Sequence, residues 1–341
     1  MMAGGSPGSP AIGGPGPSYA ARVSAPLFTV ICPAYNASGT IEATLRSVQS
    51  QTFEDFEMVV VDDGSSDETP ELIEAFAAED PRIRLVRQAN AGTAGARNRA
   101  LAEARGSLVS NIDNDDLWLP AYLESMVRAF QATPGVGLCF CRIWAFNDRS
   151  RLVHRQTFDR AGDDPPQPRV IPARELEIGL LADNFIPASG TALTREALEA
   201  AGGYDASPEL GGSDDWDLWL RVAHAGFGAV GLPEALAVWR DRFDSESKDG
   251  LMMARGGNVA ARRALERNPG DAEVEAAARW MIQLTDRQIA ERSGASPAWR
   301  AQARARGVLT AAKRLVMRRR EWLEPPAELR RFLDLVDPPG N

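Results

Sequence analysis

The chain has 341 residues, of which 44% are hydrophobic and 25% charged, and its formal net charge is −9. This composition is typical of a soluble globular protein that is large enough to bury its own core. The acidic balance argues against nucleic acid as a partner, because a duplex binder needs a net basic face. A smaller anionic ligand remains compatible with it, provided that a bound cation or local positive charge meets that ligand.

The cysteine content and the ends of the chain bear on location. Cys32, Cys139 and Cys141 are too few for a disulfide framework and form no CxxC pair, which favours a reducing, cytoplasmic compartment. No apolar run approaches 18 residues and no secretory signal is recognisable, so no membrane span is expected. Residues 1–25 are rich in Gly, Pro and Ser and are predicted to form a disordered tail.

The first part of the chain alternates short apolar runs with helical patterns. Strands are predicted at 27–32, 56–61, 83–86 and 108–112, with helices at 41–51, 69–78 and 95–104 between them. Such alternation predicts an α/β fold with a mainly parallel, Rossmann-like sheet flanked by helices. Ligands of these sheets bind where strands end, so the polar loops at 35–36, 62–65 and 113–116 are candidate site loops.

Beyond this region the pattern becomes mixed and then helical. Residues 135–240 mix strands with helices, among them 194–201 and 216–224, and the proline-rich stretch 159–169 is predicted to be a loop. From about residue 250 strand patterns disappear. We therefore predict three parts, namely the tail at 1–25, a catalytic domain at 26–250 and a helical C-terminal region at 251–341.

The acidic cluster Asp113-Asn114-Asp115-Asp116 directly follows the fourth predicted strand. Its carboxylates repel one another and are costly unless they are solvated or neutralised by a cation. Mg2+ and Mn2+ prefer a few carboxylates together with substrate phosphate oxygens, so an Asp-x-Asp here suits a metal–diphosphate site. The alternative is a solvated turn or the acidic start of a helix from Leu117 to Phe130.

Two more motifs could contact a nucleotide. Asp63, in the run from Asp62 to Asp67, could accept a hydrogen bond from a nucleobase, although the same run could simply be an Asx-turn and helix cap. Arg97, just after a glycine-containing loop, could bind phosphate or ribose oxygens. The absence of GxGxxG after the first strand and of GxxxxGK[ST] disfavours dinucleotide enzymes and P-loop NTPases.

A further acidic run begins at Ser213 and continues Asp214-Asp215-Trp216-Asp217 into an apolar helix. It can be read as helix capping or as a carboxylate that serves as general base toward a hydroxyl. Since the chain contains only His154 and His224, a carboxylate base is favoured over a histidine.

Taken together, the motifs resemble those of the family 2 inverting glycosyltransferases of the GT-A fold over roughly residues 27–250. The ordered set is Val30 to Asn36, Ser47 to Phe53, Val61 to Asp67, Asn90 to Asn98, Asp113 to Pro120, Gly202 to Asp205 and Asp214 to Arg221. The resemblance implies a hexosyltransferase-like enzyme that moves a sugar from a nucleotide sugar, expected to be a UDP-sugar, to an acceptor hydroxyl in polysaccharide or glycolipid synthesis. A saccharide or lipid-linked molecule is the expected acceptor.

The resemblance also implies residue roles. Asp215 would be the catalytic base, and Asp115 would hold Mn2+ or Mg2+ on the diphosphate. The other residues expected to contact the substrate are Pro33, Ala34, Tyr35, Asp63, Arg97, Asp113, Asp116, Asp214, Trp216 and Arg242.

Arg242 marks a departure from the family pattern. Many relatives carry Tyr-Arg-x-His late in the domain, whereas this chain reads Trp239-Arg240-Asp241-Arg242. A guanidinium cannot replace an imidazole as a metal ligand, but it could bind the diphosphate directly. A smaller departure is Asp214, where the family often has Glu.

Residues 300–320 combine many arginines with apolar positions near one helical face. They could form a helix that lies on an anionic membrane at the inner face, or one that packs on the catalytic domain.

Two other functions remain open, a sugar-1-phosphate nucleotidyltransferase and a non-catalytic nucleotide-sugar-binding relative. The first would need a Gly-rich basic loop where Pro33 to Asn36 stand, and the second would not need both Asp115 and Asp215.

Overall fold

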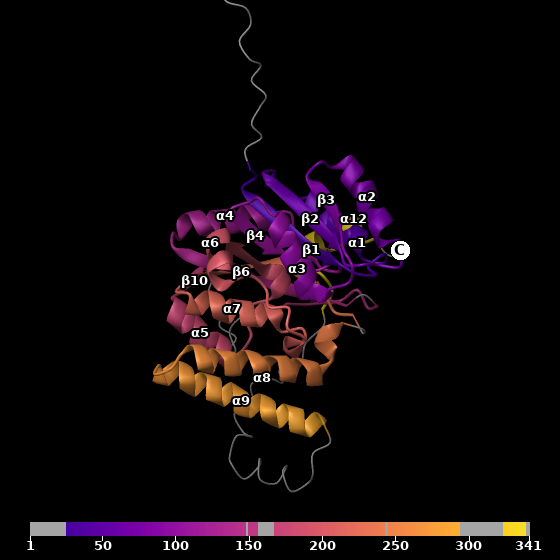
Figure 1. The fold of residues 1–341 in the computed structure, drawn as a ribbon. Helices are drawn as coiled ribbons and strands as arrows, with labels where there is room; N and C mark the ends of the chain where they lie inside the picture. Colours follow the sequence, from indigo (N-terminus) through magenta and orange to yellow (C-terminus); the bar gives the residue numbers. More distant parts are fainter. Residues whose placement is uncertain (1–24, 148, 156–166, 243–244, 294–322, 339–341) are drawn as a thin grey trace, which may run out of the picture.

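The structure is a computed structural model that describes residues 25–147, 149–155, 167–242, 245–293 and 323–338. Within these ranges the strands form a single sheet in the order β3-β2-β1-β4-β9-β6-β10-β5, and β7 and β8 pair with β6 and β10. Helices cover both faces of this sheet (Figure 1). The predicted tail at 1–25 and the basic segment at 300–320 lie outside the described residues, apart from residue 25.

The first half of the sheet is parallel. Strand β1 (Phe28–Ala34) pairs with β2 (Phe56–Asp62) and β4 (Leu108–Asn111), and β2 pairs with β3 (Ile83–Arg87). The connections are α1 (Ile41–Gln49), α2 (Thr69–Glu79) and α3 (Gly92–Glu103). The predicted alternation is confirmed, and only α3 begins clearly earlier than expected.

The second half of the sheet is mixed. Strand β9 (Thr191–Thr194) runs antiparallel to both β4 and β6 (Val136–Phe146), while β6 runs parallel to β10 (Gly228–Arg240). Short antiparallel strands complete it, namely β5 (Leu117–Trp118), β7 (Val153–Arg155) and β8 (Arg169–Ile171). The α/β class is therefore confirmed, with the parallel order concentrated in the first half.

The remaining helices include two corrections to the expected elements. The helix expected at 117–130 begins only at α4 (Tyr122–Ala132), because Leu117 and Trp118 form β5 against β10. The helix expected at 216–224 is α7 (Asp214–His224), which starts two residues earlier. The others are α5 (Ala173–Ala182), α6 (Arg195–Ala201), α8 (Gly250–Arg267), α9 (Ala272–Arg292), α12 (Ala327–Val336) and the 3-10 turns η1 (Ala188–Gly190), η2 (Pro208–Leu210) and η3 (Glu246–Lys248).

Two hydrophobic cores lie on opposite faces of the sheet, since successive strand residues point to opposite sides. Val30 and Cys32 of β1 face the core formed with α1 and α4, whereas Ile31 faces the core formed with α5, α7, α8 and α9. Cys139 and Cys141 both belong to the first core, as expected for two positions on one strand face.

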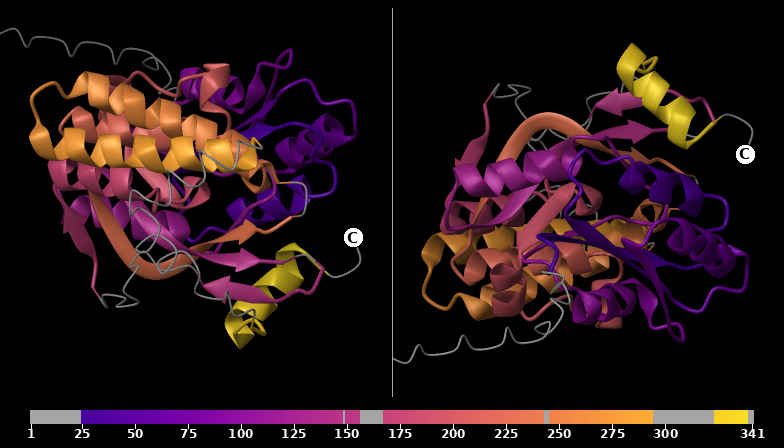
Figure 2. Two further views of the ribbon diagram at one scale, coloured as in Figure 1. Left: turned by 90° about the horizontal axis from the view of Figure 1, so that it is seen from below. Right: turned by 90° about the horizontal axis from the view of Figure 1, so that it is seen from above.

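The C-terminal helices pack in two separate places. Helices α8 and α9 lie side by side and share the core of α5 and α7, so residue 250 marks a change of secondary structure within one packed unit. Helix α12 lies on the other side of the molecule and packs on α1 and β5 (Figure 2). No helix in the described part of the chain is long and apolar enough to cross a membrane.

Candidate active site

The candidate site lies at the carboxyl ends of the parallel strands, where hydrogen bonds join three loops. The Asp63 backbone N–H donates to the Ala34 carbonyl over 2.8 Å, and Asn114 Nδ2 donates to the Pro33 carbonyl over 3.0 Å. Asn36, at a φ of 47°, accepts from the Ser66 backbone and donates to Ser65 Oγ. The end of β1 therefore holds the loops after β2 and β4 together.

Asp63 lies buried beneath this junction. Its Oδ1 accepts from Gln88 Nε2 at 2.7 Å and from the Ala91 backbone N–H at 2.9 Å. Pro33 and Ala34 are buried beside it, whereas the Tyr35 side chain is 51% exposed. One carboxylate oxygen is thus engaged in holding the loop after β3, and a base N–H would have to use the other.

The acidic turn that follows β4 is held from two sides. Asp116 is buried, and its Oδ1 accepts from the Arg240 backbone N–H at 3.0 Å, while Arg240 Nε donates to the Asp115 carbonyl at 2.8 Å. On the other side, Ser189 Oγ accepts from the Asp113 backbone N–H. The Asp115 carboxylate accepts no hydrogen bond from any other described residue.

The charges of this turn are strongly coupled. Burial, together with the Asp113 charge, raises the pKa of Asp115 to about 6, although Arg242 and Arg240 oppose the rise. Burial and the two neighbouring carboxylates raise the pKa of Asp116 well above its usual range. A divalent cation would remove this cost, because it neutralises the repelling carboxylates.

The donor set fits a cation that is shared with a substrate. No group of three or more His, Cys, Asp or Glu residues among the described residues could enclose a metal by itself. Mg2+ and Mn2+ accept one or two carboxylates when phosphate oxygens and water complete their coordination. Asp115 is half-buried, and its carboxylate accepts no hydrogen bond from the other residues that the structure describes, so it suits this kind of site better than a closed, all-protein cage.

Arg97 connects the acidic turn with α7. Its guanidinium is buried, donates to Asn111 Oδ1 at 3.2 Å, and forms 2.7 Å ion pairs with Asp113 and Asp214. It also lies 5.3 Å from the ring centroid of Tyr204. Each donor group of Arg97 is thus engaged within the protein, so the structure favours a bridging role over the predicted contact with nucleotide. Asp214 is likewise engaged by Arg97.

Asp215 follows at the start of α7 and is only partly exposed. Burial and the adjacent Asp214 charge raise its pKa to about 7, although Arg97 and the Trp216 backbone N–H oppose the rise. A carboxylate of this pKa is basic enough to take a proton near neutral pH. The fold therefore places a general-base candidate beside the arginine that also contacts the acidic turn.

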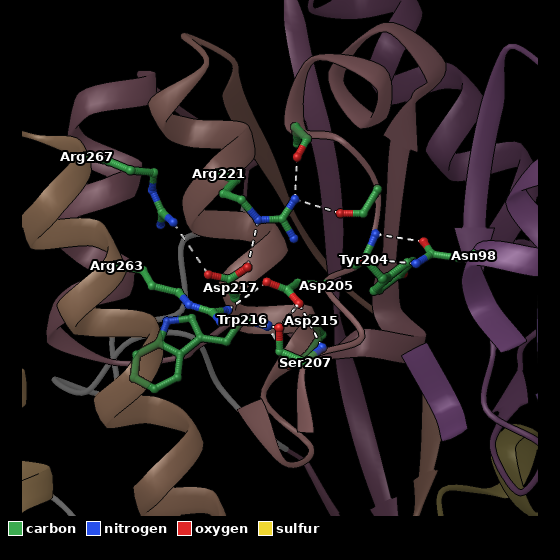
Figure 3. Close-up of polar contacts among 12 residues, drawn as sticks. Asn98, Tyr204, Asp205, Ser207, Asp215, Trp216, Asp217, Arg221, Arg263 and Arg267 are labelled. Atoms are coloured by element: carbon green, nitrogen blue, oxygen red, sulfur yellow. Dashed lines mark hydrogen bonds and ion pairs between the residues drawn. The ribbon is translucent and has the colours of Figure 1, made fainter. Parts of the chain in front are cut away.

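The position of α7 is set by a polar network around Asp217 (Figure 3). Asp217 is buried and pairs with Arg221 at 2.7 Å and with Arg267 of α8 at 3.6 Å. Arg221 also donates to the Gly203 carbonyl at 2.6 Å, and Asn98 exchanges two hydrogen bonds with the Tyr204 backbone. Helix α7 is in this way tied to α8, to α3 and to the turn after α6.

Trp216, which was predicted to contact the substrate, instead packs between helices. Trp216 is buried between helices, where its indole N–H donates to the Leu180 carbonyl and its ring faces Gly257. This position supports packing and does not support the predicted contact with substrate. Arg242, by contrast, lies close enough to Asp115 for its charge to lower the pKa of that carboxyl.

Sequence reasoning missed three residues that shape the site. Asn98 holds the turn at Tyr204, Arg240 holds the acidic turn, and Ser189 supports it from η1. Asn98 and Arg240 both lie within motifs that were recognised, so adjacency to Arg97 and Arg242 was an available indication. Nothing in the sequence around Ser189 marked it.

Comparison with known proteins decides the family. The family model "Glycosyl transferase family 2" matches residues 29–201, which is slightly more than half of the chain. The chain belongs to glycosyl transferase family 2. This glycosyltransferase is 32% identical over 218 residues to TuaG of Bacillus subtilis strain 168, which is named as a glycosyltransferase of teichuronic acid biosynthesis, covering 63% of this chain and 79% of TuaG.

Another relative of the glycosyltransferase covers less of the chain. WfgD of Escherichia coli, named as a UDP-Glc:alpha-D-GlcNAc-diphosphoundecaprenol beta-1,3-glucosyltransferase, is 42% identical over 102 residues, 30% of this chain and 40% of WfgD. The chain also spans only 41% of EpsH of B. subtilis strain 168. Several relatives therefore extend well beyond the matched part.

Solved structures show the fold of this glycosyltransferase. TarS of S. aureus, solved as residues 1–349 with UDP-GlcNAc, superposes with a TM-score of 0.59 at 18% identity, covering 77% of this chain and 72% of that one. The mannosyltransferase PcManGT of Pyrobaculum calidifontis, solved with GDP-Man and Mn2+, gives a TM-score of 0.58 at 24% identity, covering 86% and 83%. The expected GT-A fold is confirmed.

Proposed function

We propose that this glycosyltransferase moves a sugar from a nucleoside diphosphate sugar to an acceptor hydroxyl in one in-line displacement with inversion, assisted by Mn2+ or Mg2+. One observation carries the proposal. Arg97 joins, through Asp113 and Asp214, the acidic turn that could hold a metal–diphosphate and the helix that begins with a basic carboxylate. A donor and a base are thus provided for at one edge of the sheet.

The donor would bind across the three joined loops. Asp63, with one oxygen still available, would accept a base N–H, and Tyr35 would cover the base from its exposed position. A uracil or thymine N–H suits such an acceptor, and we propose a UDP-sugar as the donor, as in the UDP-GlcNAc complex of TarS. Asp113 would face the ribose side of the nucleotide.

The acidic turn and Arg242 would bind the diphosphate. Asp115 would be the main protein ligand of the cation, with Asp116 supporting it, and a bound cation would stabilise the departing nucleoside diphosphate as a Lewis acid. Arg242 would add a charge-assisted contact to the phosphate oxygens. The Mn2+ found with GDP-Man in PcManGT is consistent with this use of a divalent cation.

Asp215 would remove the proton of the acceptor hydroxyl as that oxygen attacks the anomeric carbon. A single displacement needs one base and no nucleophilic carboxylate, so no covalent sugar–enzyme intermediate forms. The acceptor would be a saccharide or lipid-linked molecule, as the name of WfgD states for that relative. Peripheral contact with the inner face of a membrane through residues 300–320 stays a prediction, as does the cytoplasmic location.

Product analysis tests the proposal. Purified enzyme with Mn2+, a panel of UDP- and GDP-sugars and a saccharide or polyprenyl-diphosphate acceptor should release nucleoside diphosphate only when the acceptor is present. Release of pyrophosphate from a sugar 1-phosphate and a nucleoside triphosphate would instead identify a nucleotidyltransferase. Binding without any release, across the panel, would favour a non-catalytic relative.

A further inference from the structure

Arg240, at the end of β10, makes three contacts with two distant segments of the chain, the acidic turn and the end of α12. Its backbone N–H reaches the Asp116 carboxylate at 3.0 Å, its Nε reaches the Asp115 carbonyl at 2.8 Å, and its Nη1 forms an ion pair of 3.1 Å with Asp337. The side chain is only 5% exposed. The last of these partners is nearly a hundred residues later in the chain, directly after α12.

Helix α12 is firmly placed beside the acidic turn. Its apolar face packs on α1, on β5 and on the ends of β6 and β10, through Leu329, Phe332, Leu333 and Val336. Leu117 in this cluster directly follows Asp116. Arg151 adds a hydrogen bond of 3.0 Å to the Asp337 carbonyl, so the end of α12 is held by polar contacts as well as by packing.

Asp337 supplies a negative charge to the buried Arg240 guanidinium. A buried guanidinium requires a negative partner, because an uncompensated charge is costly away from water. Arg240 also contacts the acidic turn through the Asp115 carbonyl and the Asp116 carboxylate, and its charge lowers the pKa of Asp115. Loss of the Asp337 charge would leave more of the positive charge of this guanidinium acting on the Asp115 carboxylate, which is the group that the proposed function assigns to the cation.

We propose that Asp337 is a positioning residue of this glycosyltransferase. It holds the Arg240 guanidinium on the backbone of the acidic turn and thereby keeps the Asp115 carboxylate available to a divalent cation. The C-terminal segment of the chain would then contribute to the metal–diphosphate site without touching substrate. This inference rests on the proposed function, because it presupposes that Asp115 binds a cation.

The test compares two carboxylates of the same segment. Asp337→Asn removes a carboxylate that pairs with Arg240, whereas Asp334→Asn removes a neighbouring carboxylate that pairs with Arg151 at 3.5 Å. Mn2+ affinity is measured by calorimetry on the full chain with UDP and, separately, with GDP. We expect Asp337→Asn to weaken Mn2+ binding about fivefold, and Asp334→Asn to leave it within about twofold of the unmodified protein.

Two further variants separate charge from packing. Asp337→Glu keeps the charge and should restore affinity to within about twofold. If Asp337→Asn does not fold, as judged by thermal unfolding, Arg240→Lys weakens the same pair from the other side and should show the same loss. Equal affinities for Asp337→Asn and Asp334→Asn, or no rescue by a folded Asp337→Glu, would overturn the inference.

The outcomes also separate this inference from the function on which it rests. If the unmodified protein binds Mn2+ with neither nucleotide, the metal-dependent function fails and the inference fails with it. If the unmodified protein binds Mn2+ and Asp337→Asn binds it equally well, only the inference fails. The expected result supports both.

Discussion

Arg97 and Asp214 are 117 positions apart in the chain, yet their side chains form a buried ion pair of 2.7 Å. The same guanidinium pairs with Asp113 at the same distance. Two carboxylates, one in the acidic turn and one at the start of α7, therefore share the Arg97 guanidinium. This relationship connects the acidic turn to the helix of the candidate base, and it makes Arg97 the first residue to test.

Replacing Arg97 with methionine should destabilise the protein strongly. The substitution keeps most of the side-chain volume but leaves Asp113 and Asp214 without their shared counter-charge, at a cost of about 3–5 kcal/mol in the free energy of unfolding. Urea unfolding followed by circular dichroism measures this quantity. Arg99→Met on the same helix, which removes a more exposed pair with Glu103, is the control and should cost less than about 1 kcal/mol. Equal decreases in the free energy of unfolding of the two variants would show that the buried ion pairs of Arg97 stabilise the protein no more than the exposed pair does.

The Asp215→Asn variant should bind donor but transfer sugar poorly. Loss of a general base typically lowers kcat by about 10²- to 10⁴-fold, whereas the residues assigned to the donor are unchanged. Initial rates and calorimetric donor affinity, measured on the same preparation, separate the two effects. Glu74→Gln, at an exposed position of α2, is the matched control and should behave like the unmodified enzyme. Activity retained in Asp215→Asn would remove this residue from the mechanism.

The pH dependence of activity should reflect the raised pKa of Asp215. The base form is required, so kcat/KM should rise with pH and level off above a pKa of about 7. The pKa of the base in the free enzyme is measured from kcat/KM as a function of pH. An ascending limb near the usual carboxyl range instead would contradict the proposed environment of Asp215.

The same group should make stability depend on pH. The folded-state pKa lies above the unfolded value, so the folded state holds the proton more tightly and loses this stabilisation as pH rises from about 4 to 7. Asp215→Asn, which resembles the protonated form, should therefore be more stable than the unmodified protein at pH 8, by about 1–3 kcal/mol. The difference should vanish near pH 4. Denaturant unfolding at pH 4 and pH 8 measures this difference in the free energy of unfolding. An Asp215→Asn variant that is less stable than the unmodified protein at pH 8 would contradict the prediction.

Substitution of Asp115 by asparagine should abolish cation binding while leaving the fold intact. The carboxylate is the main cation ligand in the proposal, and its loss also relieves repulsion from Asp113 and Asp116. We expect Mn2+ affinity in the presence of nucleotide to fall at least about 100-fold, with no decrease in metal-free thermal stability. Undiminished Mn2+ binding by the variant would move the cation site elsewhere.

Arg242→Ala should weaken donor binding. A charge-assisted contact to phosphate contributes about 1.5–3 kcal/mol, so donor affinity should fall about 10- to 100-fold. Arg242→Lys keeps the charge without the fork and should lie between the alanine variant and the unmodified protein. Calorimetric titration with nucleotide sugar decides, and unchanged affinity in Arg242→Ala would exclude the contact.

Much of the parallel half of the fold could be predicted from the sequence. The apolar runs of β1 to β4 and the helical spacing between them are local patterns, and the structure reproduces their order. The boundary before α4 was wrong for a physical reason. Leu117 and Trp118 are compatible with either structure locally, and only pairing with Ala237 and Val238 of β10 makes them a strand.

The candidate site was predicted in part. The motifs pointed to Asp63, Asp115 and Asp215. Asp63 and Asp115 lie in loops at one edge of the sheet, and Asp215 lies in the first turn of α7, which Arg97 connects to the acidic turn. The contacts of Trp216 and Arg97 were not predictable, because an aromatic ring or a guanidinium in a motif can face either core or ligand. Burial disfavours the predicted contact for Trp216, and the hydrogen bonds that each Arg97 nitrogen makes within the protein disfavour it for Arg97.

By itself, the sequence determined the family, the alternating core and the identity of the acidic residues, because these follow from short motifs in a fixed order. Only the tertiary structure decided which carboxylates form ion pairs within the protein. That outcome depends on partners far away in the chain, namely Arg97 for Asp113 and Asp214, and Asp337 for Arg240. The motif thus supplies the carboxylates of the acidic turn, whereas the fold supplies the arginines that pair with them.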